Sequence, residues 1–217
     1  RLRLRIASDL HDDLSSDLAG IAIATDLVSR RAELPTALRQ PLLELRDKAL
    51  AMVGAVRDTV WAVNPEHDSV EALVRRMRRA AGELLGDTPH AFDVRVAARE
   101  LALDMETRRA LFLIYKELLH NVARHARARQ VEIWLAAIDG RLTLHISDDG
   151  IGFETTGPKA GDGLRSLRRR ARDIGATLDL TSRPGSGTAA TVTVRMARTR
   201  DGAAAGSRHK VRPREDA

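Results

Sequence analysis

Apolar residues recur at helical spacing throughout residues 1–63. In the later part of this segment they are separated mostly by alternating steps of four and three residues, which is the narrow seam of a helix bundle or coiled coil. Pro35 and Thr36 interrupt the pattern, so we predict two long helices joined as an antiparallel hairpin. The predicted stripes are Ile6, Leu10, Leu14, Leu18, Ile21 and Val28 in the first helix, and Leu38, Leu42, Leu45, Ala49, Met52, Val56, Val60 and Val63 in the second.

Each stripe covers only one side of its helix, so a single hairpin has too small a core to be stable alone. A homodimer that forms a four-helix bundle would bury both stripes. The helical pattern stops at the segment Asn64-Pro65-Glu66-His67-Asp68. We therefore expect a dimerisation hairpin over residues 1–66 and a second domain over residues 67–197.

The second domain mixes helical and alternating patterns, which predicts an α/β two-layer sandwich with helices on one face of a mixed sheet. Phe92, Val94 and Val96 alternate as in a strand, and Asp139-Gly140 is a favoured hairpin turn. The other expected elements are helices over 69–86, 104–128 and from about 164 to 174, and strands near 131–135, 142–146, 176–182 and 188–196.

The composition excludes several classes of site. The chain has 217 residues and no cysteine, which excludes disulfide scaffolds, thiolate nucleophiles and Cys-ligated metals. It has no apolar run long enough to span a membrane and no signal-peptide pattern. Because it begins at Arg1, inside a predicted helix, we expect a cytoplasmic fragment of a longer protein, without membrane contact of its own.

The net charge of +6 raises the question of nucleic-acid binding. Half of it comes from residues 197–217, which hold six Lys or Arg against three Asp or Glu. The rest of the chain intersperses both signs and is poor in aromatic residues for base stacking. We therefore expect no direct contact with nucleic acid, and a disordered basic tail over residues 198–217.

A first candidate for chemistry is His11, which Asp12 follows directly. At ~100° per residue, His11 lies roughly 80° to the side of the apolar stripe and is within reach of a docking domain. A carboxylate that binds one ring nitrogen fixes the tautomer and makes the other nitrogen a better nucleophile. An ordinary exposed histidine is the alternative for such a residue taken alone.

A second candidate is the polar face of the helix expected over residues 104–128. Glu117, Asn121 and His125 are spaced at i, i+4 and i+8 and share one face, with Arg124 beside them. Carboxylate and amide oxygens together with cationic groups would suit a Mg²⁺–triphosphate. A polar outer face without a ligand would show the same spacing.

The third candidate is the glycine-rich stretch that follows Asp148. Gly150 and Gly152 come directly after the strand, and further glycines extend to Gly163. Such a loop lets backbone approach a ligand closely and move over it, although Asp-Gly is also a plain turn dipeptide. The segment Gly161-Asp162-Gly163-Leu164 then opens a helix, whose N-terminal amides favour phosphate. The spacing fits neither the Walker nor the Rossmann glycine motif.

Taken in order, these motifs and the final Gly187-Thr188 resemble the sensor histidine kinases. The first helix is similar to the two-component family with the phosphoacceptor motif RIARDLHDDLGSSL, because this chain has RIASDLHDDLSS from Arg5 to Ser16. Trp61-Ala62-Val63-Asn64-Pro65 resembles that family's WALNP exit from the hairpin. The resemblance covers residues 1–196 and implies a phosphotransfer hairpin followed by a Bergerat-type ATP-binding domain.

The resemblance implies autophosphorylation of a histidine by ATP, with Mg²⁺, in a homodimer, and transfer to an aspartate of a response-regulator receiver domain. His11 would be the phosphoacceptor, Asp12 the base beside it, and Glu117 part of the catalytic polar network. Asn121 would ligate Mg²⁺, with Arg124 and His125 near the phosphates. The other implied nucleotide-binding residues are Asp148, Gly150 and Gly152 around the adenine, Gly161, Gly163 and Leu164 at the lid, and Thr188 closing the adenine site.

The chain departs from that family's pattern at two positions. Ser15 replaces the common Gly, and Ser16 stands where many relatives carry Gln. Because that Gln is thought to orient water for dephosphorylation of the regulator, we expect weak phosphatase activity. Two other functions fit parts of the sequence: an ATPase or serine kinase of the same nucleotide fold, and a degenerate dimer scaffold without activity.

Overall fold

The computed structural model describes most of the chain as two compact units. One unit comprises residues 1–68 with 105–113, and the other comprises 69–104 with 114–217. The backbone is described for residues 2–31, 33–64, 69–96, 101–155 and 162–198. Side chains are described for the same ranges except residues 2–13, 63, 101–102, 162 and 197–198. The predicted tail over 198–217 therefore lies almost wholly outside the description.

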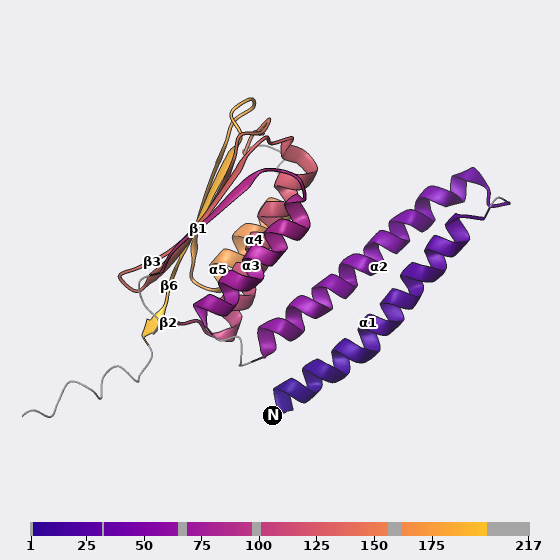
Figure 1. Ribbon diagram of the computed structural model, residues 1–217, viewed down its shortest axis with the longest axis horizontal. Coiled ribbons are helices and arrows are strands. Elements are labelled where there is room, and N and C mark those ends of the chain that lie inside the picture. The colour runs from indigo at the N-terminus through magenta and orange to yellow at the C-terminus, as the bar shows by residue number, and fades with distance from the viewer. Residues whose placement is uncertain (1, 32, 65–68, 97–100, 156–161, 199–217) are drawn as a thin grey trace, which may run out of the picture. The chain divides into compact units, whose positions relative to one another are not determined.

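The first unit is built on the predicted helical hairpin. Helix α1 (Leu2–Ser29) and helix α2 (Thr36–Val63) run side by side, as Figure 1 shows. Most of the residues buried on these two helices have small side chains. The buried residues are Ala22, Thr25 and Ser29 on α1, and Ala49, Val53, Asp58, Trp61 and Ala62 on α2.

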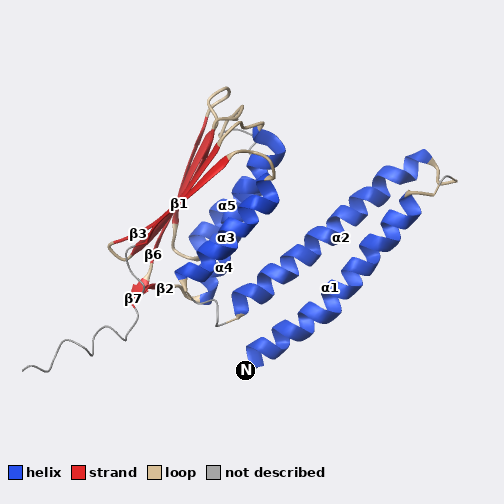
Figure 2. Cartoon of the chain, in the orientation of Figure 1, coloured by secondary structure: helices blue, strands red, loops and turns tan. Residues whose placement is uncertain are grey.

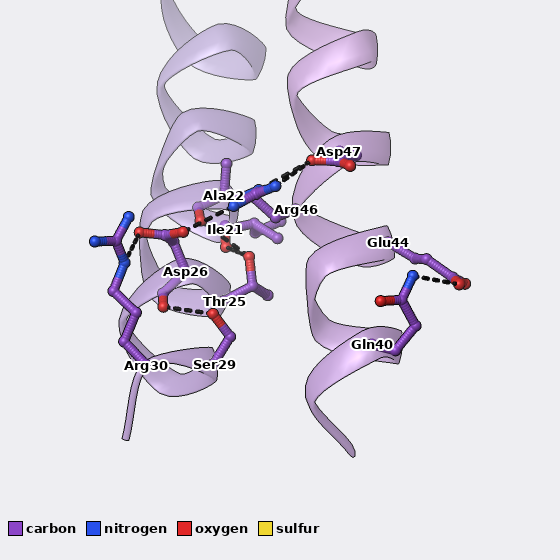
Figure 3. A network of polar contacts seen from close by, with 10 residues as sticks. All are labelled: Ile21, Ala22, Thr25, Asp26, Ser29, Arg30, Gln40, Glu44, Arg46 and Asp47. Atoms are coloured by element: carbon purple, nitrogen blue, oxygen red, sulfur yellow. Dashed lines mark hydrogen bonds and ion pairs between the residues drawn. The ribbon is translucent and has the colours of Figure 1, made fainter. Parts of the chain in front are cut away.

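A polar network joins the two helices on one side of the hairpin (Figure 3). Arg46 on α2 donates to Asp26 on α1 at 2.9 Å and to its neighbour Asp47 at 2.8 Å. Arg30 donates to the other oxygen of Asp26 at 2.7 Å. These hydrogen bonds from Arg30 and Arg46 hold the pKa of the Asp26 carboxyl below its usual range. The network therefore helps to set the register between α1 and α2.

The predicted stripes are only partly covered within one chain. Six of their members recur every seven residues on their helix and are between 37% and 57% exposed. They are Leu14, Ile21 and Val28 on α1, and Leu38, Leu45 and Met52 on α2. Contact within the hairpin thus uses one side of each helix, and a heptad-spaced apolar row stays accessible.

The first unit also includes residues 105–113, which begin helix α4 (Met105–Asn121). Arg108 is fully buried there and donates to the carbonyl oxygen of Ala62. Its guanidinium carbon lies 5.5 Å from the ring centre of Trp61, and Phe112 packs on the same ring at 5.4 Å. The end of α2 is therefore held by the first turns of α4. The boundary predicted at residues 66–67 stays a prediction.

The second unit contains the predicted mixed sheet. Its five strands are ordered β1-β3-β4-β6-β5, and only the β1–β3 pair is parallel. Helices α3, α4 and α5 all lie on one face of this sheet (Figure 2), as the predicted two-layer sandwich requires. The bounds are β1 (His90–Val96), β3 (Val131–Ile138), β4 (Arg141–Asp148), β5 (Thr177–Ser182) and β6 (Thr188–Arg195), with α3 (Val70–Leu85) and α5 (Asp162–Asp173).

Alternation along the strands builds the core between sheet and helices. Ile133, Leu135, Leu142 and Leu144 face the helices and are at most 2% exposed. Tyr115 of α4 is also fully buried, and its hydroxyl donates to the carbonyl oxygen of Met77 on α3 at 2.9 Å. This hydrogen bond satisfies the only polar atom of the Tyr115 side chain in an apolar environment.

Local details differ from the sequence-based expectation. The helix expected to continue to residue 128 is α-helical only to Asn121, and residues Val122–Ala126 form a π-helix, η2. A short antiparallel pair, β2 (Leu101–Ala102) with β7 (Ala197–Arg198), was not predicted. The β3–β4 turn is confirmed at Asp139-Gly140, where both residues have positive φ.

Candidate functional site

A cavity of about 600 Å³ opens between α4, η2, the glycine-rich loop and the sheet. It lies within the second unit, and its size suits a nucleotide-sized ligand. Eight of the residues implied by the sequence line it: Glu117, Asn121, His125, Asp148, Gly152, Gly163, Leu164 and Thr188. Motifs separated by about 70 positions in the sequence therefore meet around one space.

Helix α4 supplies one wall of the cavity. Glu117 and Asn121 of α4 are half-buried and line the cavity as their spacing predicts, and the exposed His125 of η2 lines it as well. The change to π-helix directly after Asn121 alters the direction of the later side chains, since a π-turn closes over five residues instead of four. Arg124 is exposed and does not line the cavity, and its implied place near the phosphates stays a prediction.

Gly150 lies where the glycine-rich loop crosses the end of η2. A Cβ at this position would lie 2.2 Å from the carbonyl oxygen of Ala126, and the next residue, Ile151, donates its backbone N–H to that oxygen at 2.8 Å. Gly150 does not line the cavity itself. Its part is to let the loop dock on the helix end, because any side chain would separate the two backbones.

Gly152 makes the second close contact of the loop. Its φ is +57°, and a Cβ would lie 2.0 Å from the carbonyl oxygen of Arg183. The loop is thereby held between η2 and the turn that joins β5 to β6. Gly163 opens α5 on the other side of the cavity, where a Cβ would lie 2.8 Å from the Glu117 carboxylate.

Asp148 ends β4 as a half-buried carboxylate. Burial raises the pKa of Asp148, although backbone N–H groups of Gly150 and Thr188 donate to the carboxylate and act in the opposite direction. Gly150 N–H binds Oδ1 at 2.9 Å. A half-buried acceptor next to apolar walls is suited to the amino group of a heterocyclic base.

Asp149 has a structural part that the sequence reasoning missed. Its Oδ1 accepts the backbone N–H groups of Arg129 at 2.7 Å and Gln130 at 2.9 Å. These bonds, that of Gln130 first, lower the pKa of the exposed Asp149 carboxyl. Asp149 therefore fastens the glycine-rich loop to the segment that leads from η2 into β3. The signal in the sequence that could have indicated this role is the pair of adjacent aspartates, Asp148 and Asp149, at the end of a predicted strand.

The sequence motifs did not indicate the apolar residues that line the cavity, because these residues belong to no recognisable motif. It comes from α4 and η2, from the glycine-rich loop and from inward positions of β4, β5 and β6. The lining residues of this kind are Leu118, Val122, Ala126, Ile146, Ile151, Phe153, Leu180 and Ala190. Together they form an apolar part of the cavity wall, here called the apolar slot, against which the face of a flat ring can pack.

The residues present fit Mg²⁺–ATP in kind. Asp148 and the apolar slot suit the adenine base, whereas Glu117 and Asn121 offer oxygen ligands of the type that Mg²⁺ prefers. Among the described residues, no group of three or more His, Asp or Glu could hold a metal ion on its own.

Other implied residues lie at the limits of the description. The backbone of His11 and Asp12 belongs to α1, but their side chains are not described. Gly161 lies outside the described residues. Ser16 is exposed on α1, so its hydroxyl is accessible, and the prediction of weak phosphatase activity stays open. In the described part of the chain, no helix is both long and apolar enough to cross a membrane.

Comparisons with known proteins match both units. The family described as histidine kinase matches residues 3–69. The family described as histidine kinase-, DNA gyrase B- and HSP90-like ATPase matches residues 106–198. Both matches fall on the motifs quoted above.

Individual relatives agree with these family matches. The sensor histidine kinase LiaS of Bacillus subtilis is 29% identical over 86% of this chain and 52% of its own length. The nitrate/nitrite sensor protein NarQ of Escherichia coli is 28% identical over 90% of this chain and 35% of its own length. The chain thus spans about half or less of these curated relatives.

The fold is shared with a solved structure, the histidine kinase domain of the Erythrobacter litoralis blue-light activated histidine kinase EL346. The TM-score is 0.53 at 18% identity, over 87% of this chain and 94% of the solved one. At this level of identity, the likeness shows a common fold.

Proposed function

The chain belongs to the histidine kinase family, and we propose that it acts as a sensor histidine kinase core. In this proposal the cavity binds ATP, and His11 on the hairpin accepts the γ-phosphoryl group. The observation that carries this proposal is the convergence of Glu117, Asn121, Asp148 and Thr188 on one cavity of suitable size. A response-regulator receiver domain would then receive the phosphoryl group on an aspartate.

Several residues of the cavity have a defined role in this proposal. Asp148 accepts a hydrogen bond from the base, and the apolar slot excludes water from the ring. Asn121 would hold Mg²⁺, with Glu117 in the polar network around it, and the cation would supply neutralisation of phosphate charge when bound. Gly163 leaves room for the Glu117 carboxylate at the start of α5.

His11 provides the nucleophile for the transfer. A ring nitrogen forms a bond to the γ-phosphorus while the bond from that phosphorus to the leaving oxygen of ADP breaks. Asp12 accepts a hydrogen bond or the ring proton at the other nitrogen and stabilises the charged imidazole. In the second step the N–P bond breaks as a carboxylate oxygen of the receiver aspartate bonds to phosphorus. Positioning provides most of the rate enhancement in such a transfer.

Replacement of Asn121 by Ala should remove the dependence of nucleotide binding on Mg²⁺. We expect ATP affinity of the wild-type chain to rise with added MgCl₂ and that of Asn121→Ala to stay nearly constant, because the amide ligand of the cation is lost. Calorimetric titration of ATP across a MgCl₂ series measures this dependence. Equal Mg²⁺ dependence of the two proteins would place the cation elsewhere.

The exposed heptad rows support a homodimer as part of the proposal. Leu45 is 47% exposed and Met52 is 57% exposed, although both belong to the apolar stripe of α2. Leu14 and Ile21 of α1 are 44% exposed in the same way. A second copy that covers these rows would complete a four-helix bundle.

Leu45→Glu should convert the dimer into monomers or aggregates. An unpaired charge in a bundle core costs several kcal/mol, which raises the dissociation constant by about a hundredfold or more. Light scattering at micromolar concentration measures the mass. Ala51→Glu is the matched control, because Ala51 is exposed on the same helix and is no member of the stripe. A dimeric Leu45→Glu variant, or a monomeric wild type, would contradict the proposed interface.

A further inference from the structure

Asp148, Thr188 and Ser182 form a row across three adjacent strands at one end of the sheet. The register pairs Asp148 of β4 with Thr188 of β6, and Thr188 with Ser182 of β5. Ile146, Ala190 and Leu180 lie two positions away on the same strands and line the cavity. Because side chains alternate with a period of two, all three members of the row are on the cavity side of the sheet.

Ser182 makes three hydrogen bonds that use the full capacity of its hydroxyl. Its Oγ lies 2.9 Å from the carbonyl oxygen of Gly187, 2.9 Å from the backbone nitrogen of Phe153 and 3.0 Å from Oγ1 of Thr188. A serine hydroxyl has one hydrogen and two lone pairs. A single atom, Oγ of Ser182, is therefore hydrogen-bonded to the glycine-rich loop, to the β5–β6 turn and to the first residue of β6.

The direction of each bond follows from this count. The carbonyl of Gly187 can only accept, so it takes the single hydrogen of Ser182. The N–H of Phe153 can only donate, so it occupies one lone pair of Oγ. The other lone pair is then left to accept the hydroxyl hydrogen of Thr188. Thr188 thus points its hydrogen at Ser182 and turns only lone pairs toward the cavity.

We propose that Ser182 is a positioning residue that makes Thr188 a pure acceptor, so that the site admits a 6-aminopurine and rejects a 6-oxopurine. Asp148 and Thr188 then present two acceptors side by side at the base end of the cavity. At its six-position adenine offers an amino group with two hydrogens, whereas hypoxanthine offers a carbonyl oxygen there and has its only donor on this edge at the neighbouring N1–H. Burial makes such a mismatch costly, since it leaves polar groups without hydrogen bonds. This inference rests on the proposed binding of an adenine nucleotide.

The test compares ADP with inosine 5′-diphosphate, which differs from ADP at the six-position of the base and in the protonation of N1. Calorimetry on wild type and Ser182→Ala gives the two dissociation constants. We expect Ser182→Ala to weaken ADP by about fivefold, the effect of one neutral hydrogen bond. The preference for ADP over inosine diphosphate should narrow by about tenfold, because the Thr188 hydrogen becomes free to turn toward a 6-oxo group.

Three variants distinguish orientation of the Thr188 hydroxyl by Ser182 from a general effect of Ser182 on the local structure. Ser182→Thr keeps the hydroxyl and should retain the wild-type preference. Thr181→Ala removes an exposed hydroxyl from the neighbouring position of β5 and should change neither constant. Thr188→Val should narrow the preference by itself, and adding Ser182→Ala to it should narrow the preference no further, because both changes act on the same hydroxyl.

The outcomes distinguish this inference from the proposed function. Absence of ADP binding to the wild-type chain would overturn the ATP site itself. If the wild type prefers ADP and Ser182→Ala weakens both ligands by the same factor, Ser182 only supports the fold and the inference is wrong. Additive effects of Ser182→Ala and Thr188→Val on the preference would overturn it as well.

Discussion

His11→Gln should reduce incorporation of phosphate from γ-labelled ATP to background, while ADP affinity stays within about twofold of the wild type. Glutamine has no nucleophilic ring nitrogen, so the transfer loses its acceptor. His11 belongs to α1 of the first unit, whereas the cavity lies in the second. Loss of labelling with retained nucleotide binding would therefore assign acceptance of the phosphoryl group to the first unit and nucleotide binding to the second.

A matched control strengthens this result. His90→Gln changes an exposed histidine of β1 that does not line the cavity, and it should label like the wild type. Labelling of His11→Gln at the wild-type level would refute His11 as the acceptor. Stability of the labelled wild type separates the alternatives, because phosphohistidine survives base and phosphoserine survives acid. An acid-stable label would support a serine kinase of the same nucleotide fold.

Asp148→Asn should weaken ATP by about tenfold to a hundredfold, the effect of losing one hydrogen bond to a charged group. An amide also presents a donor where the base needs an acceptor. Calorimetric titration measures the change. Asp179→Asn provides the control, since Asp179 is exposed on β5 and does not line the cavity. Unchanged affinity of Asp148→Asn would move the adenine site elsewhere.

The same variant should not lower thermal stability. Burial raises the pKa of Asp148 in the folded chain, so the folded state binds this proton more tightly than the unfolded state does. The ionised carboxylate therefore costs stability at pH values above its folded pKa, and this cost disappears as the pH falls below the pKa of the unfolded state. Asn has no such cost, and the Tm at neutral pH should stay equal or rise.

The raised pKa of Asp148 also predicts how binding depends on pH. Base recognition needs the ionised acceptor, so ATP affinity should fall as the pH decreases through the folded pKa of Asp148. That fall should begin at a higher pH than an ordinary aspartate would give. Measurement of ATP affinity across this acidic range should show the fall in the wild type and a smaller fall in Asp148→Asn.

Most of the residues proposed for the site were identifiable from the sequence, because each has a distinct functional group at a distinct spacing. Glu117, Asn121 and His125 were placed on one helix face by the period of the α-helix, and they line the cavity together. Asp148 and Gly152 were recognised from the glycine pattern after a strand, and they line it as well. Arg124 does not line the cavity, and its implied place near the phosphates stays a prediction, because spacing along a helix does not show where the helix changes its turn at η2.

The sequence by itself determined the helical hairpin, the mixed α/β domain and the polar groups of the site, since periodicity and residue type are local properties. Only the tertiary structure decided which apolar positions form the slot, how Gly150 docks on Ala126, and that Asp149 and Ser182 fasten the loops around Asp148. These features depend on contacts between segments far apart in the chain. Ser182 and Thr188 illustrate the difference, because a hydroxyl has no fixed role until folding supplies its three partners.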